Sequence, residues 1–189
     1  GPNTVTLTAS DNAGNNATCT AIVTVEDITP PTAACKDTII QLDASGNASI
    51  TANDIDNGSA DNCGITSLDL DITNFDCTNV GTNNVVLTVT DNNGNISTCN
   101  ATVTVEDNIA PTAVCNDISV PLDASGNAVI TASDINNGST DNCDIATLDI
   151  SQTNFDCSHA GDNTVTLTVT DVNGNITTCD ATVTIEDTE

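Results

Sequence analysis

The residues of this chain best suited to chemistry are its nine cysteines and its many carboxylate and amide side chains. Regularly spaced cysteines form disulfides or bind zinc, but the sequence contains no Cys-x-x-Cys pair of the kind that zinc sites use. Carboxylate, amide and carbonyl oxygens are the ligands that Ca²⁺ prefers. The sequence therefore predicts a disulfide framework in an oxidising compartment and Ca²⁺ as the bound ion.

The charge balance excludes several classes of partner. The 189 residues include 27 acidic residues against a single Lys36, for a formal net charge of -26. Phosphate binding needs Lys and Arg, so nucleic acid is excluded as a natural partner. No apolar run approaches the length needed for membrane insertion. Aromatic residues make up 1% of the chain, and so thin a core needs disulfides or metals for stability.

The cysteines and the acidic groups recur with a period of 80 residues. Cys35, Cys63, Cys77 and Cys99 match Cys115, Cys143, Cys157 and Cys179, and Cys19 matches Cys99. Self-similarity at a fixed period marks an array of equivalent units. The register predicts a first repeat at 28–107 and a second at 108–189, after a partial unit at 1–27.

Residues 1–27 match only the last hairpin of a repeat. Cys19 lacks the in-repeat partner that Cys35 would offer Cys99. We expect residues 1–27 to be the C-terminal hairpin of a truncated repeat in a longer array. The alternative is a native N-terminus at Gly1 with Cys19 as a free thiol.

Within one repeat the hydrophobic pattern has a period of two. Val85, Leu87 and Val89 alternate with Thr88 and Thr90, and the same alternation runs from Cys99 to Val105. This pattern is typical of half-buried antiparallel strands, and no segment has helical periodicity. Strands are expected at 34–42, 48–52 and 65–70, with a short piece around Phe75, a polar loop at 53–64 and a tight turn at 91–95. The fold class is therefore all-β, as tandem immunoglobulin-like β-sandwich domains.

Three oxygen-rich elements should meet at the end of each sandwich where the chain enters. They are the entering linker, the loop between the second and third strands, and the final hairpin. Six to eight oxygens suit Ca²⁺ better than Mg²⁺. The alternative is that these residues only form metal-free turns. The predicted metal ligands are Glu26, Asp27, Asp54, Asp56, Asp61, Asn62, Asp91, Asn93 and Asn95, and then Glu106, Asp107, Asp134, Asp141, Asn142, Asp171, Asn173 and Asn175.

The repeat resembles the hyalin repeat (HYR), an immunoglobulin-like extracellular module, as it occurs in tandem in bacterial secreted and surface proteins. The matching features are PTAAC at 31–35, DNCG at 61–64, the stretch from Phe75 to Gly81, and TVTDNNGNISTCNATVTV at 88–105. The resemblance covers both repeats and the partial unit. It implies extracellular adhesion and no shared catalytic site. The chain departs from the family in the residues after the first cysteine, Lys36 and Asn116, where the family usually has proline.

The resemblance implies disulfides Cys35–Cys99 and Cys115–Cys179, and the adjacency of first and last strands in such folds agrees with them. The additional cysteines are then paired by elimination as Cys63–Cys77 and Cys143–Cys157. A rival connectivity stays open, in which Cys99 bonds to Cys115 across the linker and Cys19 to Cys35.

No catalytic constellation can be assembled. His159 is the only histidine, its counterpart in the first repeat is Asn79, and it is expected to be a loop residue. The sequence favours a structural segment of an extracellular stalk, filament or adhesin, with neighbouring repeats or like subunits as partners. The alternative is a carbohydrate- or protein-binding accessory module, which exposed Phe75 and Phe155 would favour. Glycan decoration is compatible with the N-x-S/T sequons at Asn16, Asn47, Asn57, Asn95, Asn100, Asn137 and Asn175.

Overall fold

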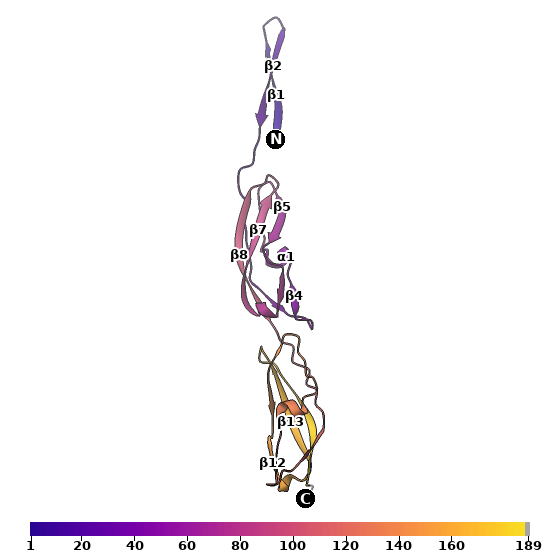
Figure 1. Cartoon of the computed structure of the whole chain (residues 1–189). Helices are drawn as coiled ribbons and strands as arrows, with labels where there is room; N and C mark the ends of the chain where they lie inside the picture. The colour runs from indigo at the N-terminus through magenta and orange to yellow at the C-terminus, as the bar shows by residue number, and fades with distance from the viewer. Residues whose placement is uncertain (188–189) are drawn as a thin grey trace. The chain divides into compact units, whose positions relative to one another are not determined.

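The computed structural model describes residues 1–187 and consists almost entirely of β-strands (Figure 1). The chain forms two compact units. The first contains residues 1–37, 51–72 and 84–102, and the second contains 38–50, 73–83 and the chain from Val103 onward. Within the described residues, no helix is long and apolar enough to cross a membrane.

The N-terminal segment is an antiparallel hairpin that forms a two-stranded sheet of its own (Figure 1). Its strands are β1 (Pro2–Ser10) and β2 (Asn16–Thr24). The Asp11 carboxylate accepts hydrogen bonds from the backbone N–H groups of Ala13 and Asn15, at 2.9 and 2.8 Å, and so closes the turn. Both faces of the hairpin are exposed to solvent, including Leu7 at 67% exposure.

The second repeat shows how the alternating sequence becomes a sandwich. Its longest strands, β13 and β14, run side by side in a four-stranded sheet of order β11-β13-β14-β9, in which β9 is parallel to β14. A separate two-stranded sheet pairs β10 with β12. The elements are β9 (Ile118–Pro121), β10 (Asn127–Val129), α2 (Ala132–Ile135), β11 (Ile145–Ile150), β12 (Asn154–Asp156), η2 (Cys157–His159), β13 (Gly161–Asp171) and β14 (Ile176–Glu186).

One face of β13 and β14 builds the core of this repeat. Successive side chains of a strand point to opposite faces, so every second residue enters the core and the threonines between them face outward. The core has one aromatic residue, Phe155, which is buried. The buried cluster consists of Ala128, Ile130, Ile135, Phe155, Val165, Leu167, Val169, Ala181, Val183 and Ile185.

The first repeat has the same elements in the same order. Its four-stranded sheet has the order β3-β8-β7-β5 with β3 parallel to β8, and β4 pairs with β6. Val85, Leu87 and Val89 are fully buried, as the alternation predicts. The fold is thus the predicted all-β immunoglobulin-like sandwich. The elements are β3 (Thr38–Gln41), β4 (Asn47–Ser49), α1 (Ala52–Ile55), β5 (Ile65–Leu70), β6 (Asn74–Asp76), η1 (Cys77–Asn79), β7 (Gly81–Asp91) and β8 (Ile96–Glu106).

The predicted polar loop at 53–64 contains a helical turn. Helix α1 has a capping box, in which the Asp54 carboxylate accepts hydrogen bonds from the backbone N–H and the hydroxyl of Thr51, both at 2.7 Å. The turn places Ile55 in the core, where it is fully buried. A helix of four residues is too short to produce a periodic pattern, so periodicity alone does not predict it.

The structure contains three disulfides among the described residues. Two join the first and last parts of a repeat, Cys35–Cys99 and Cys115–Cys179, as the family resemblance implies. The rival Cys99–Cys115 bond is therefore absent. The third disulfide, Cys77–Cys143, joins the first repeat to the second.

The predicted bonds Cys63–Cys77 and Cys143–Cys157 are wrong. Strand β5 lies between Cys63 and Cys77, and strand β11 lies between Cys143 and Cys157. Each strand moves the chain away from the first cysteine of its predicted pair. A six-residue strand spans roughly 20 Å, whereas disulfide-bonded Cα atoms lie within about 7 Å. Cys63 and Cys157 consequently remain free thiols, as does Cys19.

Candidate metal centres and the cross-repeat disulfide

Three carboxylates gather where the chain passes from the first repeat to the second. Asp107 follows the end of β8, Asp141 lies in the loop before β11, and Asp171 ends β13. Each contributes a carboxylate oxygen, and these three oxygens lie within 4.8 Å of one another. Asp107 and Asp171 are buried, with 6% and 2% exposure. We call Asp107, Asp141 and Asp171 the Asp107 cluster.

Backbone and amide groups hold the buried carboxylates in place. Asp171 Oδ1 accepts from the backbone N–H groups of Asn173 and Asn175, each at 2.8 Å, in the turn between β13 and β14. The Asn175 amide nitrogen donates to Asp171 Oδ2 at 2.8 Å and to the Asp107 carbonyl at 3.1 Å. The Asn142 amide nitrogen donates to Asp107 Oδ1 at 3.2 Å. The hairpin, the linker and the loop before β11 are thereby tied together.

Two oxygens at this cluster are buried and accept no hydrogen bond. They are Asp141 Oδ1 and Asn142 Oδ1. Leaving a buried acceptor unsatisfied costs about 1–3 kcal/mol, and more for a charged group. A cation among the carboxylates would offset the repulsion among the three negative charges and would give the Asp141 carboxylate a partner. The residues present therefore fit a hard divalent cation.

The equivalent position at the start of the first repeat has a different composition. Asp27, Asp61 and Cys63 each bring one potential ligand atom to within 4.8 Å of the others, and we call them the Asp27 cluster. Asp27 Oδ2 is buried and accepts no hydrogen bond from nitrogen or oxygen donors. A hydrogen bond from the thiol to Asp27, desolvation, and the negative charges of Asp27, Asp61 and Asp91 raise the pKa of Cys63.

Asp91 completes the correspondence between the two clusters, since it is the counterpart of Asp171. It is fully buried, and burial raises its pKa. Hydrogen bonds from the side chain and backbone of Asn95 and from the backbone of Asn93 outweigh that effect, and the net result is a pKa below its ordinary value. Asp91 is therefore built to stay ionised inside the fold.

Several of the predicted ligands lie elsewhere. Asp54 and Asp134 cap helices α1 and α2, where they accept from Thr51 and Thr131. Asp56 accepts from the backbone N–H groups of Gly58 and Ser59. Glu106 Oε2 accepts from Gln41 Nε2 at 2.7 Å. Glu26 and Asn62 are exposed, and the Asn93 N–H donates to Asp91.

Sequence reasoning missed Cys63 as a member of the Asp27 cluster. The sequence contained a signal, because Cys63 stands two residues after the predicted ligand Asp61. In the structure the Cys63 N–H donates to Asp61 Oδ2 at 2.7 Å. Pairing Cys63 with Cys77, the two additional cysteines of the first repeat, concealed it.

The cross-repeat disulfide lies beside the Asp107 cluster. Cys77 Sγ lies 3.5 Å from the carbonyl oxygen of Asn142, the residue before its partner Cys143. It also lies 3.8 Å from the carbonyl oxygen of Gly46. Gly46 has a φ of +73°, and a Cβ atom there would lie 2.7 Å from both Cys77 Sγ and the Asn142 carbonyl oxygen. Only glycine leaves room for the bond.

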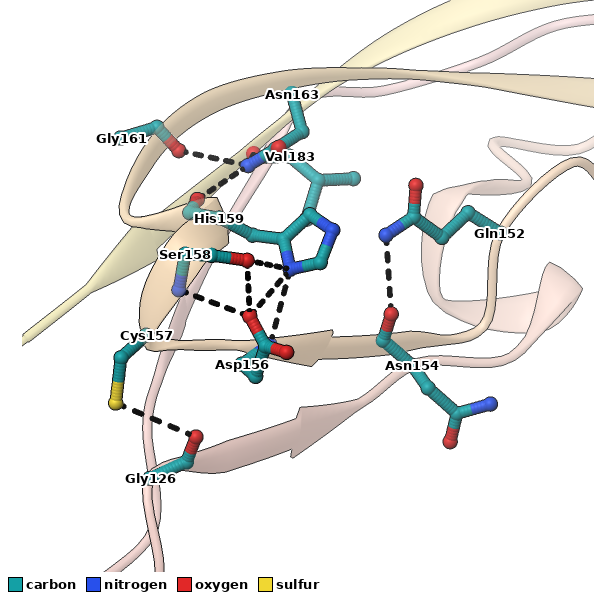
Figure 2. Close-up of polar contacts among 10 residues, drawn as sticks. All are labelled: Gly126, Gln152, Asn154, Asp156, Cys157, Ser158, His159, Gly161, Asn163 and Val183. Atoms are coloured by element: carbon teal, nitrogen blue, oxygen red, sulfur yellow. Dashed lines mark hydrogen bonds and ion pairs between the residues drawn. The ribbon is translucent and has the colours of Figure 1, made fainter.

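His159 was predicted to be a loop residue and lies in the short 3₁₀ helix η2. Its Nδ1 lies 2.8 Å from Asp156 Oδ1 and accepts from the Asp156 N–H at 3.2 Å, within the short helix η2 (Figure 2). Asn79 closes the corresponding turn of the first repeat by accepting from the Asp76 N–H at 2.9 Å. The His159 ring also meets the edge of Phe155, with ring centroids 5.6 Å apart. Asn79 and His159 are thus interchangeable caps.

Comparison with known proteins gives a family-model match for the first repeat. No curated protein sequence matches the chain. Similar solved structures include protocadherin gamma B7 extracellular cadherin domains 1–4 (12% identity, TM-score 0.40), with 98% of this chain and 58% of that chain covered. They also include mouse clustered PcdhgC3 EC1–3 (13%, TM-score 0.39; 98% and 77% covered) and titin domains I67–I69 (10%, TM-score 0.41; 98% and 75% covered). The model of the HYR domain matches residues 26–105 of this chain.

Proposed function

We propose that the chain is a structural segment of an extracellular tandem-repeat stalk, filament or adhesin, whose successive repeats are joined by disulfides and by Ca²⁺. HYR domains are extracellular modules, and three disulfides suit an oxidising environment. The observation that carries the proposal is the Cys77–Cys143 bond, because a covalent link between successive repeats suits a structural array better than modules that act independently.

The proposal includes the domain boundaries that the period predicts, 28–107 and 108–189, with 1–27 as the last hairpin of a further repeat. Each full repeat contains the same set of strands and one internal disulfide, which supports the boundaries. The hairpin β1–β2 aligns with β7–β8 in the repeat, but no other strands cover it, since Leu7 is 67% exposed and its counterpart Leu87 is fully buried.

We assign Ca²⁺ to the Asp107 cluster and to the carboxylates of Asp27, Asp61 and Asp91, with the Cys63 thiol of the Asp27 cluster left out as a ligand. The donors are carboxylates and amide oxygens from several loops, which suit the larger and less geometrically demanding Ca²⁺ rather than Mg²⁺. The unsatisfied oxygens of Asp141 and Asn142 support the first site, and Asp27 Oδ2 supports the second. A cation held by the linker residue Asp107 and by two loops of the second repeat would fix the linker against that repeat.

A carbohydrate-binding role would need an exposed aromatic platform. Phe75 and Phe155, the only aromatic residues of the chain, are each 98% buried, so no observation favours that alternative.

Calorimetry in excess Ca²⁺ and in excess chelator tests the metal sites. Ligand binding to the folded state alone adds about 2.7 kcal/mol at a hundredfold excess over Kd, and Tm is expected to rise by several degrees. In Asp141→Asn the part of this rise that comes from the Asp107 cluster is expected to disappear. Asp134→Asn is the matched control, because Asp134 caps α2 outside the cluster, and it should keep the full rise. Identical melts with Ca²⁺ and with chelator would refute the metal assignment.

Small-angle scattering tests the structural role. In the oxidised, Ca²⁺-loaded chain the distribution of maximum dimensions is expected to be narrow, and the double variant Cys77→Ser/Cys143→Ser should broaden it. The double variant Cys63→Ser/Cys157→Ser removes two unpaired thiols, keeps the cross-repeat bond and should retain the narrow distribution. A distribution that is the same for all three proteins would contradict the proposal.

A further inference from the structure

The free thiols Cys63 and Cys157 occupy the positions of the two partners in the cross-repeat disulfide. Cys157 is the counterpart of Cys77, and Cys63 is the counterpart of Cys143, in each case 80 residues away. Cys77 and Cys143 are bonded to each other, whereas Cys63 and Cys157 are exposed and unpaired. The chain therefore presents both halves of the same bond, each without its partner.

The surroundings of Cys157 match those of Cys77 in detail. Both cysteines begin a short 3₁₀ helix that is capped by the preceding aspartate. Cys157 Sγ lies 3.7 Å from the Gly126 carbonyl oxygen, and Figure 2 shows the sulfur directed at this atom. The corresponding distance from Cys77 to Gly46 is 3.8 Å. Gly126 has a φ of +75°, and a Cβ atom there would lie 2.8 Å from Cys157 Sγ.

The match extends to the other half of the bond. The N–H of Cys63 donates to Asp61 Oδ2 at 2.7 Å, and the N–H of bonded Cys143 donates to Asp141 Oδ2 at 2.8 Å. Both cysteines lie in an Asp-Asn-Cys segment just before a strand that begins with isoleucine. The backbone that holds the bonded cysteine is thus already formed around the free one.

We propose that Cys157 and Cys63 are disulfide-forming sites for neighbouring repeats: Cys157 bonds to the Cys143-type cysteine of one repeat, and Cys63 to the Cys77-type cysteine of another. The inference deepens the proposed function, on which it rests for the presence of such repeats. Cys19 does not belong to this set, because its counterpart Cys99 bonds within its own repeat.

The chemistry is thiol–disulfide exchange with a small-molecule or protein disulfide as the oxidant. The two thiols lose two protons and two electrons and form one S–S bond, and the oxidant disulfide is cleaved to two thiols.

A tandem chain tests the inference within one polypeptide. A second copy of residues 108–187 follows Asp187, so that the linker sequence of the natural junction is repeated. After refolding with oxidised glutathione, peptide mapping should find Cys157 bonded to Cys143 of the added copy. Cys157→Ser in the original repeat should leave Cys143 of the added copy open to alkylation. Cys19→Ser should leave the disulfide pattern unchanged. The Cys35–Cys99 and Cys115–Cys179 peptides in the same digest report that the repeats have folded.

A second arm asks whether a separate copy can supply the partner. Two variants, Cys19→Ser/Cys63→Ser and Cys19→Ser/Cys157→Ser, are mixed in the presence of oxidised glutathione. Cys157 is then the only free thiol of the first variant, and Cys63 is the only free thiol of the second. A Cys157–Cys63 heterodimer assigns the bond to separate copies as well. A bond in the tandem chain alone assigns it to one polypeptide.

The inference is overturned if Cys157 stays alkylatable in the folded tandem chain and no heterodimer forms. It is also overturned if each protein alone dimerises as readily as the mixture, because the two thiols would then not be complementary. The Ca²⁺-dependent melt is an independent measurement, so a failure of the metal assignment leaves this result intact.

Discussion

At the scale of single residues, the electrostatic free energy of folding depends on the buried carboxylates. Asp91, Asp107 and Asp171 are buried in a chain whose only Lys or Arg is Lys36. An ionised group taken out of water must be compensated by hydrogen bonds or by an opposite charge. Backbone N–H groups and asparagine amides compensate Asp91 and Asp171. The acceptors that remain unsatisfied are the ones that the proposed Ca²⁺ would bind.

Gly46→Ala tests the space that the cross-repeat bond requires. The new methyl group would lie 2.7 Å from Cys77 Sγ, at a backbone conformation with positive φ. We expect a large loss of the Cys77–Cys143 peptide after oxidative refolding, measured by peptide mapping without reduction. Gly58→Ala is the matched control, since Gly58 also has a positive φ, +86°, but nothing lies within 4 Å of the added atom. Each variant should lose about 1–2 kcal/mol from backbone strain, and only Gly46→Ala should lose the disulfide. Equal disulfide yields in the two variants would contradict the steric argument.

The capping aspartates give a defined pH dependence. Hydrogen bonds from the backbone N–H and the hydroxyl of Thr131 lower the pKa of Asp134 below its ordinary value. The ionised carboxylate therefore stabilises the fold above the unfolded pKa of about 4, and this contribution is lost as the pH falls through the lower folded pKa. In urea titrations, Asp134→Asn should lower the unfolding midpoint at pH 7 and should have little effect at pH 2.

Asp149→Asn is the control for this prediction, because Asp149 is an exposed residue of strand β11 outside any helix cap. A difference between wild type and Asp134→Asn that persists unchanged at pH 2 would rule out the carboxylate as its source.

At the scale of elements, the same hairpin occurs in two environments. Strands β7 and β8 bury their apolar face in the first repeat, whereas β1 and β2 leave the equivalent residues in solvent. About half of the strand positions differ between the two hairpins, but Val5, Leu7 and Val23 keep the apolar residues of Val85, Leu87 and Val103. We therefore expect burial to decide how much these positions contribute to stability.

Leu87→Ala and Leu7→Ala measure that difference. Leu87 is fully buried, and its truncation is expected to cost about 2–5 kcal/mol. Leu7 is 67% exposed, and its truncation should change the free energy of unfolding by less than about 0.5 kcal/mol. Urea unfolding of the oxidised proteins gives both values, with Leu167→Ala as a second buried reference. A comparable loss for Leu7→Ala would mean that the hairpin face is covered in solution.

The period-two pattern predicted most of the fold, because strands β7, β8, β13 and β14 are long and have one apolar face. Val85, Leu87 and Val89 are buried as expected. Short elements were harder to predict, and most of α1 was predicted as part of the polar loop at 53–64. The capping box formed by Thr51 and Asp54 was the local signal that could have revealed it.

The site was only partly predictable. The pattern indicated that Asp107, Asp141 and Asp171 would meet, since they come from the linker, the loop before β11 and the final hairpin. It could not separate them from Asp134, whose carboxylate is used by its own helix. Pairing by elimination failed for Cys77 because it considered partners within one repeat only, while the partner lies 66 residues on, in the next.

At the scale of the whole molecule, the three disulfides form overlapping loops. Cys77 lies between Cys35 and Cys99, and Cys143 lies between Cys115 and Cys179. The loop closed by Cys77–Cys143 therefore contains the linker and overlaps both internal loops. The first and second repeats are joined twice, once by the peptide chain and once by sulfur.

This double connection determines what happens when the polypeptide is cut. A protease site inserted after Asn108 would, when cleaved, yield two fragments that stay together on a non-reducing gel and separate on a reducing one. In Cys77→Ser/Cys143→Ser the fragments should separate without reductant, whereas Cys63→Ser/Cys157→Ser should behave like wild type. A surface fibre built in this way tolerates a single nick in any such linker. Two successive repeats separate only when a protease cuts the linker between them and a reductant also breaks the disulfide that joins them.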